Sequence, residues 1–219
     1  MGWSEFVLAL VAFLLSHTIP VRAPVKPWLV ARIGSHGFAA FYSALSLALL
    51  GWVIVAAERA PYVQIWAWAP WQNWLAIAGM LVASLIVALS LGKPNPFSFG
   101  GPDSGFDPDA PGLVRATRHP LLVALALWAV LHGVANGSLA FGVLFFCLAG
   151  FSILGMKIID RRRQRLMGAD WARIRNRVRA AKAPLVQIPQ DVARLTCGVI
   201  GWLILILGHN AVLGVSPWP

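Results

Sequence analysis

The stretch TRHPLLVALALWAVLHGVANGSLAFGVLFFCLAGFSILGM runs from Thr117 to Met156 and consists of two long apolar segments joined by a short polar link at residues 136–138. About 20 apolar residues in a helix are enough to cross the hydrocarbon core of a bilayer, which is about 30 Å thick. We therefore predict two membrane-spanning helices here, over residues 119–136 and 138–156.

Four further apolar segments extend this pattern outward, near residues 3–20, 36–57, 71–91 and 195–215. Hydrophobic residues make up 58% of the 219-residue chain and charged residues only 12%, which excludes an ordinary soluble domain. The first segment contains Glu5 and lacks a basic leader, so we expect a retained helix rather than a cleaved signal peptide. The expected fold is an all-α polytopic transmembrane helical bundle of about six helices in one domain, residues 1–219.

Basic residues gather in three stretches, residues 22–32, 93–118 and 157–194, and Arg59 alone of the 18 lysines and arginines lies elsewhere. Because basic residues collect on the cytoplasmic side of a membrane, these stretches are predicted to be cytoplasmic, with the N-terminus on the outer side. The formal charge of +10 thus indicates topology and attraction to anionic lipid, and it does not indicate a nucleic-acid partner.

Two cytoplasmic stretches differ in composition. Residues 93–112 are dense in Pro, Gly and Asp, which predicts an ordered lid of turns able to cover a site. Residues 160–179 interleave Leu166, Trp171, Ile174 and Val178 with many arginines, which predicts a basic amphipathic helix lying on the inner leaflet. A solvated loop that only fixes the topology is the alternative for this second stretch.

Neither cysteine indicates covalent cofactor chemistry. Cys147 and Cys197 stand on different predicted helices and the chain has no CxxCH motif, which excludes c-type haem attachment. Both are expected to act as small buried hydrophobic residues.

All five histidines lie in or at the ends of apolar segments, where an ionisable side chain is costly. On the predicted topology His17, His36 and His119 lie toward the cytoplasmic side, whereas His132 and His209 lie in the outer half. The step from His119 to His132 covers about 20 Å of helix, so these two cannot share one metal. Neutral imidazole is a common metal ligand and the commonest proximal ligand of haem, but a hydrogen-bonded structural role is equally expected for any single membrane histidine.

Local context separates the candidate ligands from the rest. His17 precedes a helix-breaking Thr-Ile-Pro sequence, where backbone carbonyls can orient the ring. His132 precedes Gly133, which lets a flat cofactor or a neighbouring helix approach. His36 and His209 are expected to be structural.

A basic cluster marks the start of one predicted helix. His119 stands before Pro120, which is tolerated in the first turn, where backbone donors are unpaired. With Arg115 and Arg118 nearby, this helix start predicts contacts to haem propionates or to another anion such as phosphate.

Several segments together resemble the NnrU family over nearly the whole chain. They are SEFVLALVAFLLSHTIPVRAP, FAAFYSALSLALLGWVIVAA, PNPFSFGGPD, TRHPLLVALALWAVLHGVANG and IIDRRRQ with the following GADWARI. NnrU proteins are bacterial inner-membrane proteins linked with denitrification and nitric oxide metabolism, and the family is similar to 15-cis-zeta-carotene isomerase, a haem b enzyme. The resemblance implies non-covalent haem b with axial ligands His17 and His132, while Ala129 stands where the isomerase has a cysteine implicated in ligand exchange.

The function that this resemblance implies takes two forms. In the isomerase-like form, haem acts on an apolar isoprenoid or carotenoid polyene that enters from lipid. In the NnrU-like form, the protein senses, carries or helps to process nitric oxide, or supports a reductase partner. Six-coordinate iron suits electron transfer, whereas binding nitric oxide requires one ligand to leave. No catalytic side chain is assigned in either form.

The choice of ligand pair stays open at this point. The predicted depths separate His17 from His132, although a bis-histidine haem needs both rings at one iron. The alternative pairs are His17 with His119 and His132 with His209.

Two other function classes also stay open. Arg118, His119 and Pro120, with Asp160 downstream, look like the integral-membrane methyltransferases that use S-adenosylmethionine. A non-enzymatic assembly factor for a nitrite or nitric oxide reductase would need neither cofactor.

Overall fold

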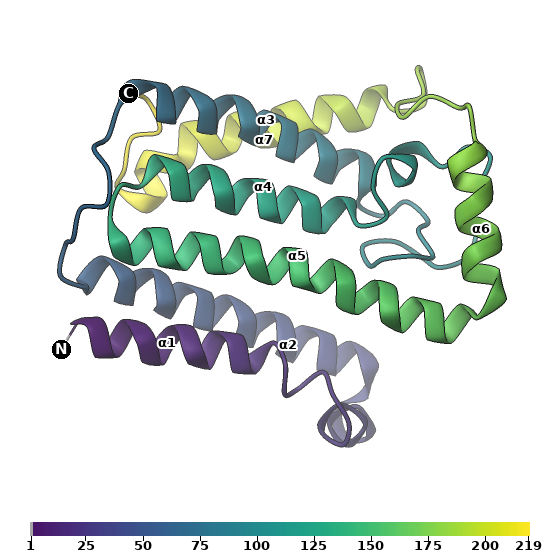
Figure 1. Cartoon of the computed structure of the whole chain (residues 1–219), viewed down its shortest axis with the longest axis horizontal. Helices are drawn as coiled ribbons and strands as arrows, with labels where there is room; N and C mark the ends of the chain where they lie inside the picture. The colour runs from purple at the N-terminus through teal and green to yellow at the C-terminus, as the bar shows by residue number, and fades with distance from the viewer. Residues whose placement is uncertain (1) are drawn as a thin grey trace. The chain divides into compact units, whose positions relative to one another are not determined.

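A computed structural model of the protein describes residues 2–219, which fold mainly into helices (Figure 1). Within this part of the chain the helices are, in order, α1 (Gly2–Ser16), α2 (Val25–Arg59), α3 (Pro70–Ser90), α4 (Pro120–Ala135), α5 (Leu139–Met167), α6 (Ala169–Ala180) and α7 (Val192–Leu213). A short 3-10 helix, η1 (Gly112–Arg115), precedes α4. The predicted all-α fold class is confirmed.

The apolar helices match the predicted spans but differ from them in length. Helices α2, α3, α5 and α7 are long and apolar enough to cross a membrane, whereas α1 and α4 are apolar but shorter. At 1.5 Å per residue, α1 and α4 rise only about 22–24 Å. Helix α2 begins before the predicted residue 36, and Gly34, with φ of 73°, interrupts its helical geometry just before that point. Helix α5 continues beyond residue 156 and carries Asp160 past the apolar run.

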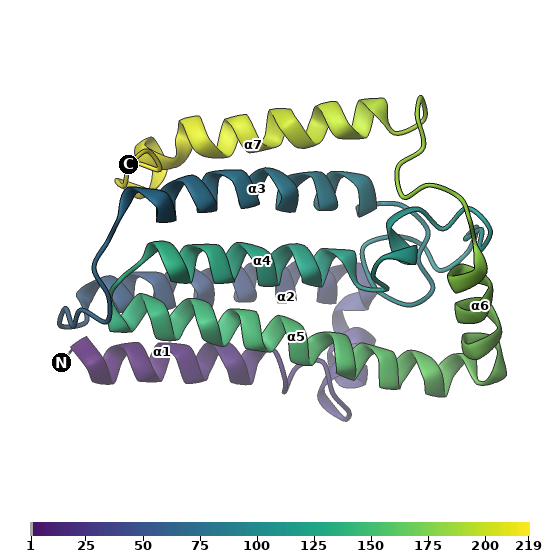
Figure 2. The same cartoon turned by 45° about the horizontal axis from the view of Figure 1, so that its top comes forward.

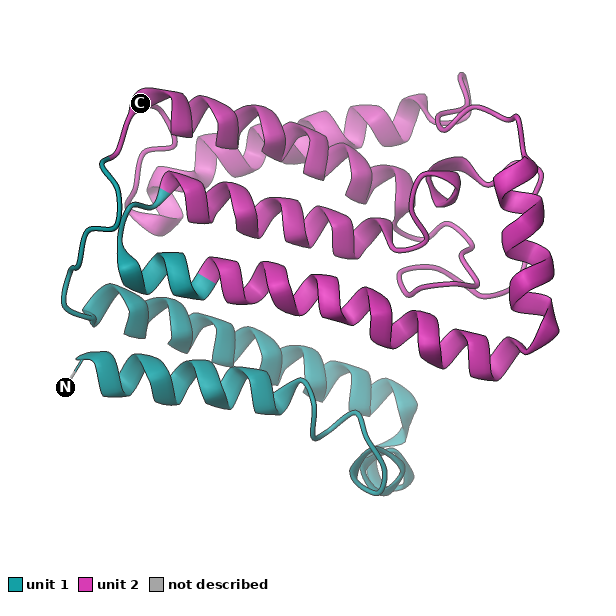
Figure 3. Ribbon diagram, viewed as in Figure 1, with its two compact units in different colours: residues 1–67, 136–144 teal, residues 68–135, 145–219 magenta. Residues whose placement is uncertain are grey.

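The chain divides into two compact units, residues 1–67 with 136–144 and residues 68–135 with 145–219 (Figure 3). In the first unit α1 packs along α2. Its buried residues include Phe6, Ala9 and Phe13 of α1 and Val53 and Ala56 of α2. Main-chain hydrogen bonds between residues 63–65 and 137–139 hold the start of α5 to the segment that follows α2.

In the second unit α3 packs against both α4 and α7, as Figure 2 shows. Small residues allow the close approach of α7, because a Cβ placed on Gly198 would lie 3.0 Å from Leu85 Cδ2 and 3.1 Å from Ala88 Cβ. Gly133 of α4 likewise leaves room for Phe146 and Phe145 of α5, because a Cβ placed on it would lie 3.1 Å from Phe146 Cζ and 3.3 Å from Phe145 Cβ. These contacts fix α4 and α7, the helices that carry two of the histidines.

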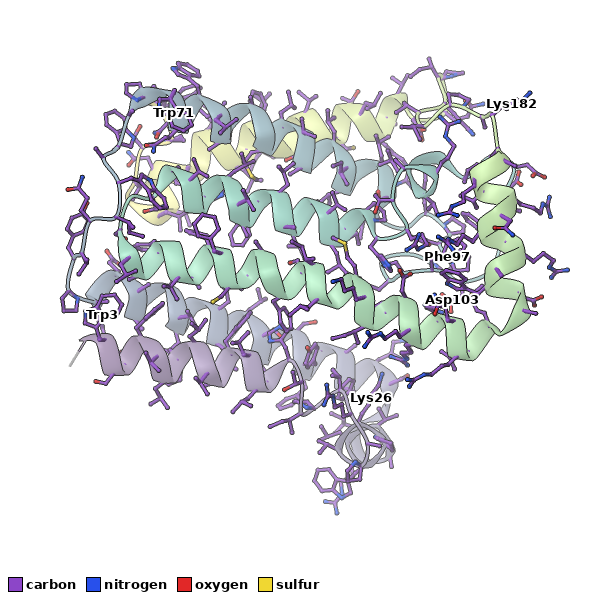
Figure 4. The ribbon with its side chains drawn as sticks, viewed as in Figure 1. Trp3, Lys26, Trp71, Phe97, Asp103 and Lys182 are labelled. Atoms are coloured by element: carbon purple, nitrogen blue, oxygen red, sulfur yellow. The ribbon has the colours of Figure 1, made fainter. Side chains whose placement is uncertain are left out.

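A second apolar cluster covers one end of this unit. Phe97 and Val114 come from the segment between α3 and α4, and Trp171 and Val178 come from α6. Figure 4 shows Phe97 beside α6, where its ring meets that of Trp171 edge to face at 6.2 Å. The amphipathic helix expected at the inner leaflet therefore buries its apolar side against the protein's own loop, and Leu166 belongs to α5 instead. The sequence shows the apolar stripe but not which surface covers it.

Candidate functional site

Two histidines of the second unit lie next to each other. His132 comes from α4 and His209 from α7, and their ring centroids are 6.5 Å apart, with ring planes inclined by 27°. The rings of Trp128 and Phe145 each lie 5.3 Å from that of His132. His132 and His209, which the sequence analysis placed in the same half of the bundle, are therefore neighbours in the structure.

Backbone carbonyls orient both of these rings. His132 Nδ1 lies 2.8 Å from Trp128 O, and His209 Nδ1 lies 2.7 Å from Val215 O. A carbonyl oxygen only accepts, so Nδ1 donates its proton and Nε2 carries the lone pair of the neutral ring. Metal-ligating histidines are commonly held by such Nδ1–H bonds, with the other ring nitrogen on the metal.

His17, the other ligand that the sequence predicts, lies in the first unit directly after α1. Its Nδ1 lies 2.8 Å from Phe13 O, and its ring lies 5.7 Å from that of Tyr42 on α2. This hydrogen bond, from Nδ1 to the carbonyl oxygen four residues earlier, is of the same kind as the bond between His132 and Trp128. Both predicted ligands are therefore held in the same tautomer, with the lone pair on Nε2.

A compact polar cluster lies where α4 begins. Arg118 donates from Nε to Asp160 Oδ1 at 3.0 Å and from Nη2 to Asp160 Oδ2 at 2.5 Å, which is a bidentate arrangement. His119 is 3% exposed, with Nε2 3.1 Å from Asp160 Oδ1 and Nδ1 3.0 Å from Ser98 Oγ. The cluster thereby joins the segment between α3 and α4, the start of α4 and the polar C-terminal half of α5.

Burial and the neighbouring charges act on His119 in opposite directions. Burial lowers the pKa of His119, and the nearby Asp160 carboxylate offsets that effect only in part. The hydrogen bond to Asp160 raises the pKa of Arg118 above its usual value. Because Asp160 accepts from Nε2 of His119, Nδ1 accepts from the Ser98 hydroxyl, and binding a metal would break one of these two bonds.

The three residues of the predicted anion site at the start of α4 do not converge on one point. Arg118 and His119 converge on Asp160, so a carboxylate of the protein itself stands where an external anion was expected. Arg115 instead donates from Nη1 to Ala181 O at 3.3 Å and to Ala183 O at 2.6 Å. It therefore holds the segment that follows α6.

Two ion pairs that were not predicted from the sequence connect the segment between α3 and α4 to other parts of the second unit. Lys93 pairs with Asp191, a carboxylate that is 2% exposed and also accepts from Gln187 N. Arg163 of α5 pairs with Asp103 at 2.7 Å. These partners lie 60 to 98 residues apart, and no spacing in the sequence connects them.

The described residues were compared with the side-chain clusters that hold a bare metal ion. Within residues 2–219 no three or more His, Cys, Asp or Glu side chains gather as they would around a bare metal ion. Haem iron takes at most two axial ligands from the protein, so single, separately oriented histidines suit it better.

The first comparison with known proteins matches residues 5–217 to the family described as NnrU protein. The comparisons with curated proteins and with solved structures give no match. The matched range covers nearly the whole chain and includes His17, His132 and the Arg118–Asp160 cluster. The chain belongs to the NnrU family.

Proposed function

We propose that this chain is a membrane haem b protein in which His132 is one axial ligand. The observation that carries the proposal is the orientation of His132. Trp128 O holds its Nδ1, Nε2 bears the lone pair, and the rings of Trp128 and Phe145 shield the imidazole. When bound, haem would supply a redox-active iron, and these residues would orient its ligand and keep water away.

His17 and His209 are the two candidates for the opposite axial position. The resemblance implies His17, whose Nδ1 is held by Phe13 O in the same manner as that of His132. His209 is supported by its position, because metal–imidazole bonds of about 2 Å put the centroids of two opposed rings on the order of 6 Å apart. Its separation of 6.5 Å from His132 is of this size. His119 is left out because both of its ring nitrogens are hydrogen-bonded.

We place this haem protein in nitric oxide metabolism and denitrification at the bacterial inner membrane, with the N-terminus in the periplasm. Membership of the NnrU family supports the link to nitric oxide metabolism and denitrification. The concentration of basic residues in three stretches supports the proposed topology. The enzymatic form of the proposal is isomerisation of an apolar polyene that enters from lipid. The non-enzymatic form is binding of nitric oxide after one axial ligand leaves, or electron supply to a reductase partner.

Single histidine variants, expressed with haem supplied, test the ligand assignment. We expect His132→Ala to lose the sharp reduced absorbance bands, and either His17→Ala or His209→Ala to lose them as well. His36→Ala is the matched control, because this exposed histidine is not proposed as a ligand. The assignment of His132 is wrong if His132→Ala keeps the wild-type spectrum at equal haem content, and the assignment of the opposite ligand is wrong if His17→Ala and His209→Ala both keep it.

Methyl transfer from S-adenosylmethionine is a second candidate, favoured by the convergence of Arg118 and His119 on Asp160. In the structure these side chains bond to one another, as expected of a structural clamp. Isothermal titration with S-adenosylmethionine separates the two candidates. Binding that Arg118→Ala abolishes would support methyl transfer, whereas no heat of binding would leave the cluster a structural role.

A further inference from the structure

Two buried hydrogen-bond donors on α6 have no acceptor among residues 2–219. They are Nε1 of Trp171 and Nε of Arg175. The residues stand four positions apart and therefore on the same face of the helix, and the Arg175 guanidinium carbon lies 4.9 Å from the centroid of the Trp171 ring. Buried donors without acceptors are rare and costly in folded proteins, and an unseen ion is one of the explanations that they call for.

Positive charge exceeds negative charge around these donors. The Arg118 guanidinium lies 5.7 Å from the same Trp171 ring, and its carboxylate partner is Asp160. Burial and the positive charges of Arg179 and Arg118 lower the pKa of Arg175. The positive charges of Arg118 and Arg179 both act on Arg175, and Asp160, the carboxylate that acts on it, is already bonded to Arg118; an added anion would relieve the repulsion.

We infer that Trp171 and Arg175, with Arg118 beside them, form a binding site for a phosphate-type anion. A tetrahedral oxyanion has several acceptor oxygens and can receive both orphan N–H groups at once. The planar guanidinium fork suits phosphate in particular. The anion would sit between α6 and the start of α4, at the end of the unit that the charge distribution assigns to the cytoplasm.

This site differs from the anion contacts predicted from the sequence, because Arg115 and His119 take no part in it. It is also independent of the proposed haem function, since none of its residues is a candidate iron ligand. The phosphate could belong to an anionic lipid headgroup at the inner leaflet or to a free phosphate in the cytoplasm. Both sources present the same chemistry to the two donors.

Thermal unfolding of the full-length protein distinguishes these sources. The probes are nanodiscs of phosphatidylcholine with and without phosphatidylglycerol, and separately millimolar sodium phosphate against sodium chloride of equal ionic strength. Stabilisation by phosphatidylglycerol alone identifies a lipid headgroup, and stabilisation by phosphate as well identifies a site open to the free ion. If neither probe stabilises the wild-type protein, the inference is overturned.

Two variants and a matched control localise the effect. Arg175→Gln should weaken the response to the anion by about tenfold in the concentration required. Arg173→Gln removes the same charge from the same helix but from an exposed side chain paired with Asp170, and it should respond as the wild type does. An equal loss in both variants would reduce the effect to general surface charge and refute the site.

Trp171→Phe distinguishes a bound anion from a buried water as the acceptor of the indole N–H group. The substitution keeps an aromatic ring for the two guanidinium groups and removes only the indole N–H donor. If an anion accepts from that donor, the variant loses phosphate-dependent stabilisation. If nothing but buried water meets the donor, the variant keeps the wild-type response to phosphate, which would overturn the assignment of Trp171.

Discussion

Replacing Asp160 with Asn tests whether the polar cluster at the start of α4 holds that end of the second unit together. The substitution keeps the side-chain volume but removes the charge that receives two hydrogen bonds from Arg118 and one from His119. Asp160 is 18% and Arg118 30% exposed, so water screens the pair in part. Breaking a buried pair costs about 3–5 kcal/mol and an exposed pair contributes about 0–1 kcal/mol. We therefore expect the free energy of unfolding to fall by about 2–3 kcal/mol.

The assay is detergent-induced unfolding in mixed micelles, followed by circular dichroism. Asp170→Asn is the control, because its pair with Arg173 is exposed on both sides and should contribute less than about 0.5 kcal/mol. Combining Asp160→Asn with Arg118→Met should cost less than the sum of the two single changes, since they remove one interaction. A loss for Asp160→Asn no larger than that for Asp170→Asn would refute the clamp.

Three further outcomes follow from the packing and the electrostatics. Burial lowers the pKa of His119 below its unfolded value of about 6.5. The contribution of His119 to stability is therefore complete above that pH and is lost as the pH falls. His119→Gln should flatten this part of the pH dependence of unfolding. Gly198→Ala should cost about 1–3 kcal/mol of unfolding free energy by crowding α3, whereas Gly201→Ala, with nothing within 4 Å of the added methyl, should be neutral or stabilising. Phe97→Ala should cost about 3–5 kcal/mol and expose α6 to limited proteolysis; an unchanged cleavage pattern would show that Phe97 does not hold α6.

Much of the helical fold could be predicted from the sequence because the relevant signals are local. The apolar runs fixed the positions of α3, α4 and α7 to within a few residues, and proline begins both α3 and α4. The neighbourhood of His132 and His209 was among the alternatives that the sequence offered, because helix rise converts residue number into distance along the bundle.

What could not be predicted depends on contacts between distant residues. Ser98 lies 21 residues from His119, and nothing in the spacing marks it as a partner. Asp160 lies 41 residues away, and only the resemblance to methyltransferases grouped it with His119. The apolar stripe of α6 was visible, but whether lipid or protein covers it depends on Phe97, which a turn-rich loop supplies. Sequence periodicity identifies a face that must be buried and does not identify its partner.

Whether His132 holds haem is decided by the absorbance spectrum of the purified protein, oxidised and dithionite-reduced, recorded beside that of His132→Ala. We expect a Soret band with sharp reduced alpha and beta bands in the wild-type protein, and their loss or marked shift in the variant. A folded wild-type protein that stays colourless with haem supplied during expression would refute haem binding, and a variant whose spectrum matches that of the wild type would refute ligation by His132.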